Sequence, residues 1–242
     1  MRTIGVVQAR MGSTRLPGKA LAEINGQALV LWTLAAMDAV PHLDGLIVAI
    51  TAEPQDDPLA TVLIAHGYRV HRGSTRDVLR RCWEAVSPFE PDVVVRETAD
   101  NPFVDPAVVA AQVRFLIEGD FDFVGTTGWP LGIAAEVARA TALAAADAEA
   151  VDTAEREHVM PFLYARPERF RIGALTPVEP LPPGRFTVDT MDDLTFARAM
   201  AERIGGMGPT SVATLGAILA DEPELLDLNH DVRQKAWQEA ER

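Results

Sequence analysis

The sequence predicts an α/β protein built on a mostly parallel sheet with helices on both faces. Its first half alternates at least four times between short apolar runs and longer helical runs, the pattern of repeated strand–helix units. The short runs are apolar almost throughout, as expected for strands buried on both faces. No linker or internal repeat interrupts the alternation. The 242 residues, 48% of them hydrophobic, suffice for one α/β core, so we expect a single domain over residues 1–242.

Strands are expected where apolar and β-branched residues run together over strand length. In the first half, the predicted strands are 4–7, 46–51, 68–71, 92–97 and 121–124. A later strand is expected at 185–188, ending at Asp189.

Helices are expected where apolar residues recur at helical spacing behind a start signal. Asp57 and Pro58 suit the first turn of one helix, and Ser74 is a candidate N-cap of the next. Asp105 followed by Pro106 begins another. The predicted helices are 29–40, 56–66, 74–86, 105–118, 138–150, 157–164, 191–204 and 211–220. The charged tail beyond residue 220 is expected to be mobile surface, without an assigned role.

The loop after the first predicted strand is rich in cations, glycines and hydroxyls. Its residues include Gln8, Arg10, Gly12, Ser13, Thr14, Arg15, Gly18 and Lys19. Glycines let the backbone approach a ligand, and Arg and Lys neutralise phosphate charge. We therefore predict a triphosphate-binding loop, because open α/β sheets bind ligands where a strand passes into a helix. The alternative is a solvated basic loop.

The spacing of this loop excludes a P-loop. That motif places four residues between its glycines and a hydroxyl residue after the lysine, which holds magnesium. Here five residues separate Gly12 from Gly18, and Ala20 follows Lys19. The dinucleotide pattern of three spaced glycines is absent from the loop as well.

Two aspartates each follow directly after, or shortly after, a predicted apolar strand. Asp100 comes after the strand 92–97, and Asp189 comes after the strand 185–188. If both lie at the carboxyl edge of the sheet, near the basic loop, they form a magnesium site, since hard oxygen ligands suit a hard cation. Alternatively, each is a turn former or helix cap, and Asp189 with Thr190 would then cap the helix from residue 191.

Several motifs resemble the sugar-acid cytidylyltransferases. The first is Gln8-Ala9-Arg10-Met11-Gly12-Ser13-Thr14-Arg15-Leu16-Pro17-Gly18-Lys19. It is followed, in the family's order, by Gly73-Ser74, Asp77-Val78-Leu79, Arg96-Glu97-Thr98-Ala99-Asp100-Asn101-Pro102, Arg156-Glu157-His158-Val159 and Val188-Asp189-Thr190. Within these enzymes, the sequence most resembles the branch of proteins like spore coat polysaccharide biosynthesis protein F. The CMP-Kdo and CMP-sialic acid (acylneuraminate) synthetases resemble it more distantly.

The resemblance implies a three-layer αβα, Rossmann-like nucleotidyltransferase fold of the GT-A type. It also implies a magnesium-dependent transfer of CMP from CTP to a sugar acid or related small acceptor, with release of pyrophosphate. The residues that match the family's catalytic positions are Arg10, Arg15, Lys19 and Asp100, and those that match its metal-binding aspartates are Asp100 and Asp189.

The same resemblance assigns the two substrates to further positions. Expected nucleotide-binding residues are Gln8, Ala9, Arg10, Gly12, Ser13, Arg15, Lys19, Thr51, Arg72, Gly73, Ser74 and Arg96. Expected acceptor-binding residues are Asn101, Glu136, Arg156, Glu157 and His158.

Residues 126–185 are punctuated by Gly and Pro and depart from the strand–helix pattern. We expect an inserted segment that binds the acceptor, forms a homodimer, or does both. Where close relatives tend to read Gly-Leu-Asp-Val-Glu, this chain has Gly132-Ile133-Ala134-Ala135-Glu136. The missing aspartate leaves the identity of the acceptor open.

Composition excludes several other classes. The net charge is −13, whereas a general nucleic-acid binder would be basic. Because Cys82 is the single cysteine, an intrachain disulfide is excluded, which fits the reducing cytoplasm. Cys82 lies in an apolar helical pattern and is expected in the core. No signal peptide and no membrane span are expected, since the chain enters a strand at once and no apolar run reaches membrane-spanning length.

Other functions stay open. The same fold would serve another NTP, or a phosphate or phosphonate acceptor. A glycosyltransferase of related fold would use a nucleotide sugar, but the cations of the loop favour a free triphosphate. A nucleotide-binding protein without turnover would not need both aspartates.

Overall fold

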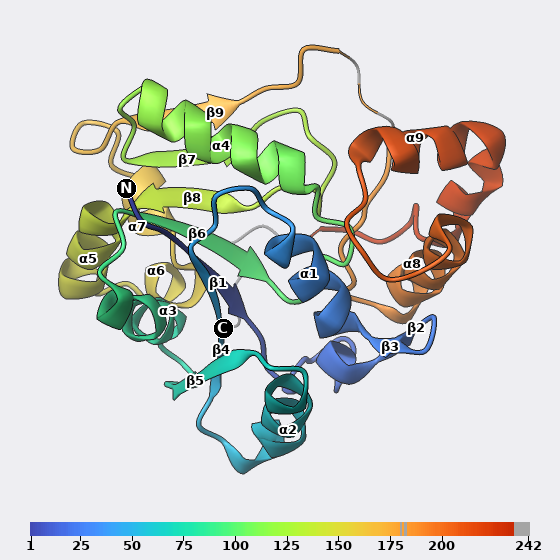
Figure 1. Ribbon diagram of the computed structural model, residues 1–242, viewed down its shortest axis with the longest axis horizontal. Helices are drawn as coiled ribbons and strands as arrows, with labels where there is room; N and C mark the ends of the chain where they lie inside the picture. The colour runs from blue at the N-terminus through green and yellow to red at the C-terminus, as the bar shows by residue number, and fades with distance from the viewer. Residues whose placement is uncertain (180, 182, 235–242) are drawn as a thin grey trace.

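The computed structural model describes residues 1–179, 181 and 183–234. A seven-stranded sheet lies at its centre, in the order β5-β4-β1-β6-β8-β7-β9 (Figure 1). The strands are β1 (Thr3–Gln8), β4 (Gly45–Thr51), β5 (Arg69–Gly73), β6 (Val93–Thr98), β7 (Phe123–Thr126), β8 (Glu136–Arg139) and β9 (Ile172–Leu175), with a separate ribbon of β2 (Glu23–Ile24) and β3 (Gln27–Ala28). Only β8 runs antiparallel to its neighbours within the large sheet. The predicted mostly parallel α/β fold is confirmed.

Helices cover both faces of the sheet because the strand residues alternate between two cores. On β1, Val7 packs in one core with α1 (Leu29–Asp38), α2 (Asp57–Ala65) and α4 (Pro106–Glu118). Ile4 and Val6 pack in the other core. The helices of that second face are α3 (Val78–Val86), α5 (Ala140–Glu149) and α7 (Pro161–Tyr164). Buried on both sides, β1 positions the loop that follows it.

A third core joins the C-terminal helices to α1, α4 and the loop after β6. Phe103 and Phe186 pack there with α8 (Met191–Ile204) and α9 (Val212–Asp221). α8 packs on β2, and α9 packs on α8, at one side of the molecule (Figure 1). The chain between β9 and α8 thereby passes Asp189 close to the end of β6, where the Val188 N–H donates to the Asp100 carbonyl at 2.8 Å.

Most helix starts follow the predicted signals. Asp105 caps α4, accepting from Ala107 N at 2.9 Å, and its other oxygen accepts from Val212 N, also at 2.9 Å, at the start of α9. The predicted Ser74 cap is wrong. Asp77 caps α3, because its Oδ1 accepts from Arg80 N, while Ser74 Oγ accepts from Asp77 N and closes the turn before the helix.

The segment 126–185 contains most of the other differences. Strands β8 and β9 were not predicted, and the start of the predicted helix 138–150 belongs to β8. The predicted helix 157–164 is two helices, α6 (Thr153–His158) and α7, because Val159 adopts φ 74° between them. Residues 185–188 form a single bridge, Leu131 to Arg185, and no strand. Phe186 is instead drawn into the third core.

Part of the predicted mobile tail is ordered. The 3₁₀ segment Pro223–Leu228 packs on α8 and α9 and buries Leu225. Residues 235–242 lie outside the described residues. Among the helices of the described part of the chain, none is long and apolar enough to span a bilayer.

Candidate active site

Two adjoining cavities form one cleft at the carboxyl ends of β1 and β6. The smaller has a volume of about 280 Å³ and the larger of about 800 Å³. The residues lining both are Gln8, Arg10, Thr14, Arg15, Thr98, Asp100, Glu157, His158 and Asp189. The cleft therefore lies where open α/β sheets bind ligands.

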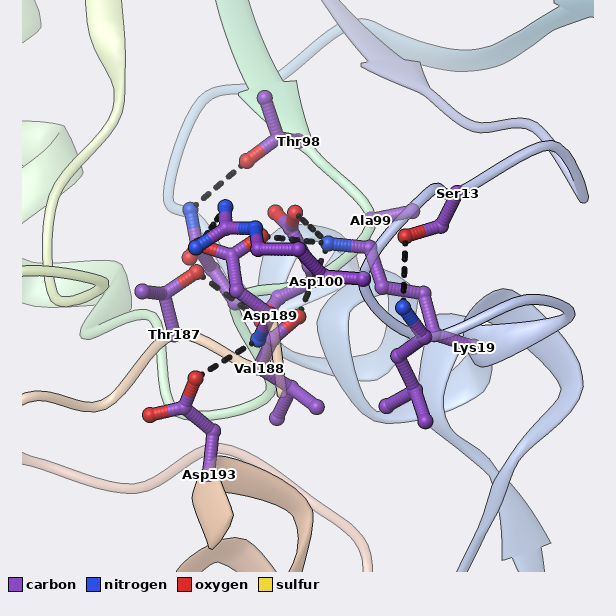
Figure 2. A network of polar contacts seen from close by, with 12 residues as sticks. Ser13, Lys19, Thr98, Ala99, Asp100, Thr187, Val188, Asp189 and Asp193 are labelled. Atoms are coloured by element: carbon purple, nitrogen blue, oxygen red, sulfur yellow. Dashed lines mark hydrogen bonds and ion pairs between the residues drawn. The ribbon is translucent and has the colours of Figure 1, made fainter. Parts of the chain in front are cut away.

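Lys19 joins the two aspartates at the floor of the cleft. Its Nζ donates to Asp100 Oδ2 at 2.6 Å, Asp189 Oδ1 at 2.8 Å and the Val188 carbonyl at 2.9 Å (Figure 2). Gly18, at φ 75°, makes the left-handed turn that leads into Lys19. Burial lowers the pKa of Lys19, but the two carboxylates outweigh it and raise the pKa above its ordinary value. The ammonium is therefore charged.

Asp189 is held as a carboxylate by three cations. Burial raises its pKa, but Lys19, Arg15 and Arg185 outweigh burial and bring the pKa below its usual value. Arg15 lies 2.9 Å and Arg185 2.6 Å from Asp189 Oδ2. Thr190, in a capping box with Asp193, is the N-cap of α8. The side chain of Asp189 therefore faces the cleft and does not cap the helix.

The oxygens around Lys19 match the ligands of a hard cation. Two carboxylate oxygens and one carbonyl converge on Nζ within 2.9 Å. Asp100 Oδ1 is buried and has no hydrogen-bond partner among the described residues. Across the described residues, no group of three or more His, Cys, Asp or Glu side chains is arranged to hold a metal ion. The pair therefore fits a divalent cation, whose other ligands would have to come from substrate or water.

A second polar network crosses the sheet in the wall of the larger cavity. Arg96 on β6 donates from Nε to Gln8 Oε1 at 3.0 Å and from Nη1 to Glu136 Oε2 at 2.5 Å. The three residues lie on neighbouring strands, and Arg96 is paired in register with Glu136. Burial lowers the pKa of Arg96, but Glu136 outweighs it and raises the pKa. The network therefore fixes a charged pair in the wall of the cleft.

His158 lies at the end of α6 and faces the shared part of the cleft. Burial lowers the pKa of His158 below its ordinary value, although Glu157 opposes this. Its Nε2 is buried and finds no partner among the described residues. The imidazole is therefore neutral at pH 7 and has a nitrogen free to hydrogen-bond a ligand.

The structure brings most of the predicted site residues together. Those lining one or both cavities are Gln8, Ala9, Arg10, Ser13, Arg15, Lys19, Arg96, Asp100, Asn101, Glu136, Glu157, His158 and Asp189. Those outside both linings are Gly12, Thr51, Arg72, Gly73, Ser74 and Arg156.

The side chains outside the cleft are engaged elsewhere. Thr51 is buried and donates to Asp56 Oδ2 at 2.6 Å. Arg72 pairs with Asp57 at 2.6 Å. Arg156 hydrogen-bonds Asp77 and the Asp147 carbonyl, tying α6 to α3 and α5. These contacts give the three residues structural roles in the ligand-free protein.

Sequence reasoning missed four polar side chains of the site. Arg81 lines the smaller cavity, Glu97 the larger and Thr98 both, while Arg185 holds Asp189. Arg81 and Val78 lie three residues apart on α3, a helical spacing that puts both on the cleft side. Glu97 and Thr98 lie in the Arg96–Pro102 motif, in which only Arg96, Asp100 and Asn101 were assigned roles from the sequence.

Glu97 is a buried carboxyl that supports the turn carrying Asp100. Its Oε1 accepts from Thr98 N at 2.7 Å and Asn101 Nδ2 at 2.6 Å. Its Oε2 is buried without a partner among the described residues. Burial raises the pKa of Glu97 to about 8, against the lowering effect of these hydrogen bonds.

We expect Glu97→Gln to remove a pH dependence of stability. The folded state holds the proton of Glu97 between about pH 4.5 and pH 8, where the unfolded state has lost it, so wild-type stability falls as pH rises through this window. From pH 6 to pH 9 the wild type should lose ~2–3 kcal/mol that the variant keeps. Urea unfolding at both pH values measures the difference. Exposed Glu118→Gln is the control, and parallel pH curves for wild type and Glu97→Gln would contradict the assignment.

Comparison with known proteins assigns the family. A cytidylyltransferase family model matches residues 4–235. The spore coat polysaccharide biosynthesis protein SpsF of Bacillus subtilis is 31% identical over 233 residues, covering 90% of this chain and 94% of SpsF. A cytidylyltransferase from Leptospira borgpetersenii superposes with a TM-score of 0.89 at 24% identity, over 97% of this chain and 100% of that one.

A more distant structure has the same fold. It is a CMP:2-keto-3-deoxy-manno-octonic acid synthetase complexed with CTP, with a TM-score of 0.68 at 16% identity, over 84% of this chain and 100% of that one. The family model and the coverage of SpsF confirm the resemblance noted in the sequence. The chain therefore belongs to the cytidylyltransferase family and is a nucleotidyltransferase.

Proposed function

We propose that the enzyme transfers CMP from CTP to a hydroxyl of a sugar acid or a related small acceptor, with the help of Mg²⁺. The observation that carries the proposal is that Asp100 and Asp189, which line both cavities, converge on Lys19 of the smaller cavity. One cavity is then available to the nucleotide and the other to the acceptor, with the reacting phosphate between them.

In this reaction an acceptor oxygen forms a bond to the α-phosphorus. The bond from that phosphorus to its bridging oxygen breaks, pyrophosphate leaves, and the hydroxyl proton passes to solvent. Arg10, Arg15 and Lys19 would hold the β- and γ-phosphates and stabilise the departing pyrophosphate, because charge neutralisation and positioning supply most of the catalysis in such transfers.

Asp100 and Asp189 would hold the Mg²⁺. Bound there, the ion supplies charge neutralisation at the phosphate and lowers the pKa of the acceptor hydroxyl. The Lys19 ammonium lies among the same oxygens, so Lys19 would turn from the carboxylates toward the triphosphate. Arg185, at 2.6 Å from Asp189 Oδ2, would keep that carboxylate oriented during the exchange.

The larger cavity supports a hydroxylated, charged acceptor. Asn101, Glu136, Glu157 and His158 line it, offering donors and acceptors for hydroxyl groups. Ala134 and Ala135, from the stretch that departs from the family pattern, line it as well. The departure therefore bears on acceptor choice, while the similarity to a polysaccharide biosynthesis protein favours a sugar-derived acceptor.

Three further points belong to this proposal. Residues 126–185 would supply acceptor contacts and a homodimer interface, and Arg156 would act on the acceptor only through α6. The dimer and the cytoplasmic location stay predictions.

Pyrophosphate release with each NTP, Mg²⁺ and a panel of sugar acids tests the proposal. We expect release with CTP and at least one sugar acid. If pyrophosphate is released only with another NTP, or only with a phosphate or phosphonate acceptor, the enzyme is a nucleotidyltransferase with a different substrate. Turnover of a nucleotide sugar without pyrophosphate would point to a glycosyltransferase, and binding of CTP without any turnover to a non-catalytic protein.

A further inference from the structure

Arg81 is a buried cation in the wall of the smaller cavity. It extends from α3 and is only 1% exposed, yet it lines this cavity together with Gln8, Ala9 and Val78. The cations predicted for the triphosphate, in contrast, lie on the loop after β1. Arg81 is therefore placed for a different part of the ligand.

The guanidinium of Arg81 is almost unsatisfied. Its one hydrogen bond among the described residues runs from Nη1 to the Ser74 carbonyl at 2.5 Å, and its Nε is buried without a partner there. The other buried or nearly buried arginines near the cleft have carboxylate partners: Arg96 pairs with Glu136, and Arg185 with Asp189 and Asp193. A buried charge without such a partner is costly, so a ligand that accepts from Arg81 would recover hydrogen bonds that the protein leaves unmade.

The segment predicted to bind the base seats Arg81. A Cβ at Gly73 would lie 2.9 Å from Arg81 Cγ, so glycine makes room for the arginine stem. The next residue, Ser74, supplies the carbonyl that accepts from Nη1. Gly73 and Ser74, neither of which lines a cavity, therefore act on the cleft through Arg81.

The position of α3 separates Arg81 from the acceptor. α3 packs on β5, β4 and β1, at one end of the sheet order. The larger cavity is lined by residues of β6, β8 and β7, at the other end. With the aspartates between the two, the nucleoside half of the substrate falls on the side of Arg81, where Ala9 and Val78 provide apolar surface for a flat ring.

We infer that Arg81 reads the pyrimidine edge of the nucleotide by donating to O2 and N3 of cytosine. This rests on the proposed use of CTP. Cytosine presents two adjacent acceptors there, and a planar guanidinium donates to such a pair in parallel. Uracil carries a hydrogen on N3, so the same edge would set a donor against a donor. Arg81 is thus a specificity-determining residue for CTP over UTP.

Arg81→Met tests the inference, with Arg80→Met as the matched control. Arg80 is the neighbouring arginine, 51% exposed and paired with Glu84 and Asp147. Replacing an unpaired buried charge by a methionine of similar length should leave the fold intact, which thermal unfolding checks. Calorimetric titration then measures binding of CMP, UMP and inorganic pyrophosphate.

We expect Arg81→Met to weaken CMP binding about 100-fold and to abolish the preference for CMP over UMP, because a site built to hydrogen-bond its substrate discriminates through those bonds. Pyrophosphate binding should not change. Arg81→Lys, which keeps the charge without the planar fork, should also lose the preference.

A retained CMP preference in Arg81→Met, full rescue by Arg81→Lys, or an equal loss of pyrophosphate binding would overturn the inference. If wild type prefers CMP but turns over no NTP, the proposed reaction fails while the role of Arg81 stands. If CTP is turned over and Arg81→Met keeps its preference, only the role of Arg81 fails.

Discussion

Asp100→Asn should lower kcat/KM for CTP by about 10³-fold in the presence of Mg²⁺, because a carboxylate ligand of the ion supplies several kcal/mol to the charged transition state. Asp100 has one oxygen bound to Lys19 and another buried without a partner among the described residues. The asparagine has nearly the same shape but no charge, so binding of the ion weakens while the fold is kept. Initial rates of pyrophosphate release across a Mg²⁺ titration measure the loss.

Asp92→Asn is the matched control for this change. Asp92 precedes β6, which Asp100 follows, and its side chain is 56% exposed and hydrogen-bonds the Arg2 N–H at 2.6 Å. We expect wild-type turnover from it. Asp189→Asn should match Asp100→Asn, and the double variant should be little worse than either, since we propose that the two aspartates act on one ion. Intact magnesium-dependent turnover in Asp100→Asn would show that the metal assignment is wrong.

Lys19→Met should separate the two roles proposed for Lys19. Without the ammonium, kcat/KM for CTP is expected to fall about 100-fold, since one charged donor to the triphosphate is lost. Binding of Mn²⁺ in the absence of nucleotide should become tighter, because Nζ no longer occupies the oxygens of Asp100, Asp189 and Val188. Electron paramagnetic resonance of free Mn²⁺ measures this affinity without any turnover.

Arg171→Met serves as the control for Lys19→Met. Arg171 is 61% exposed, pairs with Asp120 and lines neither cavity of the cleft. We expect no change in turnover or Mn²⁺ binding from it. Should Lys19→Met bind Mn²⁺ no better than wild type, Lys19 does not compete with the ion.

Much of the fold could be predicted because its signals are local. The helix at Met191–Ile204 was predicted to the residue, and its Thr190 cap and Asp193 form a capping box. The predicted bounds of β1 and β6 differ by one residue at each end from those in the structure, since β1 and the first half of β6 are buried apolar runs. Strands of four residues, β8 and β9, escaped detection because so short a run carries no distinct period.

The site was predicted unevenly for a similar reason. The cations of the first loop, Asp100 and Asp189 occur in recognisable motifs, and the structure brings them to one cleft. Arg81 and Glu97 matter through burial and missing partners. Burial and hydrogen bonding depend on residues that are distant in the sequence, so a local sequence pattern does not predict them.

By itself, the sequence determined the parallel α/β fold, the family, and the basic loop with its two aspartates, because periodicity, caps and motifs are written in adjacent residues. Only the tertiary structure decided how these parts meet. Lys19 hydrogen-bonds Asp100 and Asp189, which lie far from it in the sequence. The order of strands places the cleft wall that carries Arg81 apart from the strands that line the cavity we propose for the acceptor. Such contacts arise from packing of the whole chain, and the same packing buries Arg81 beside the cavity that we assign to the nucleotide.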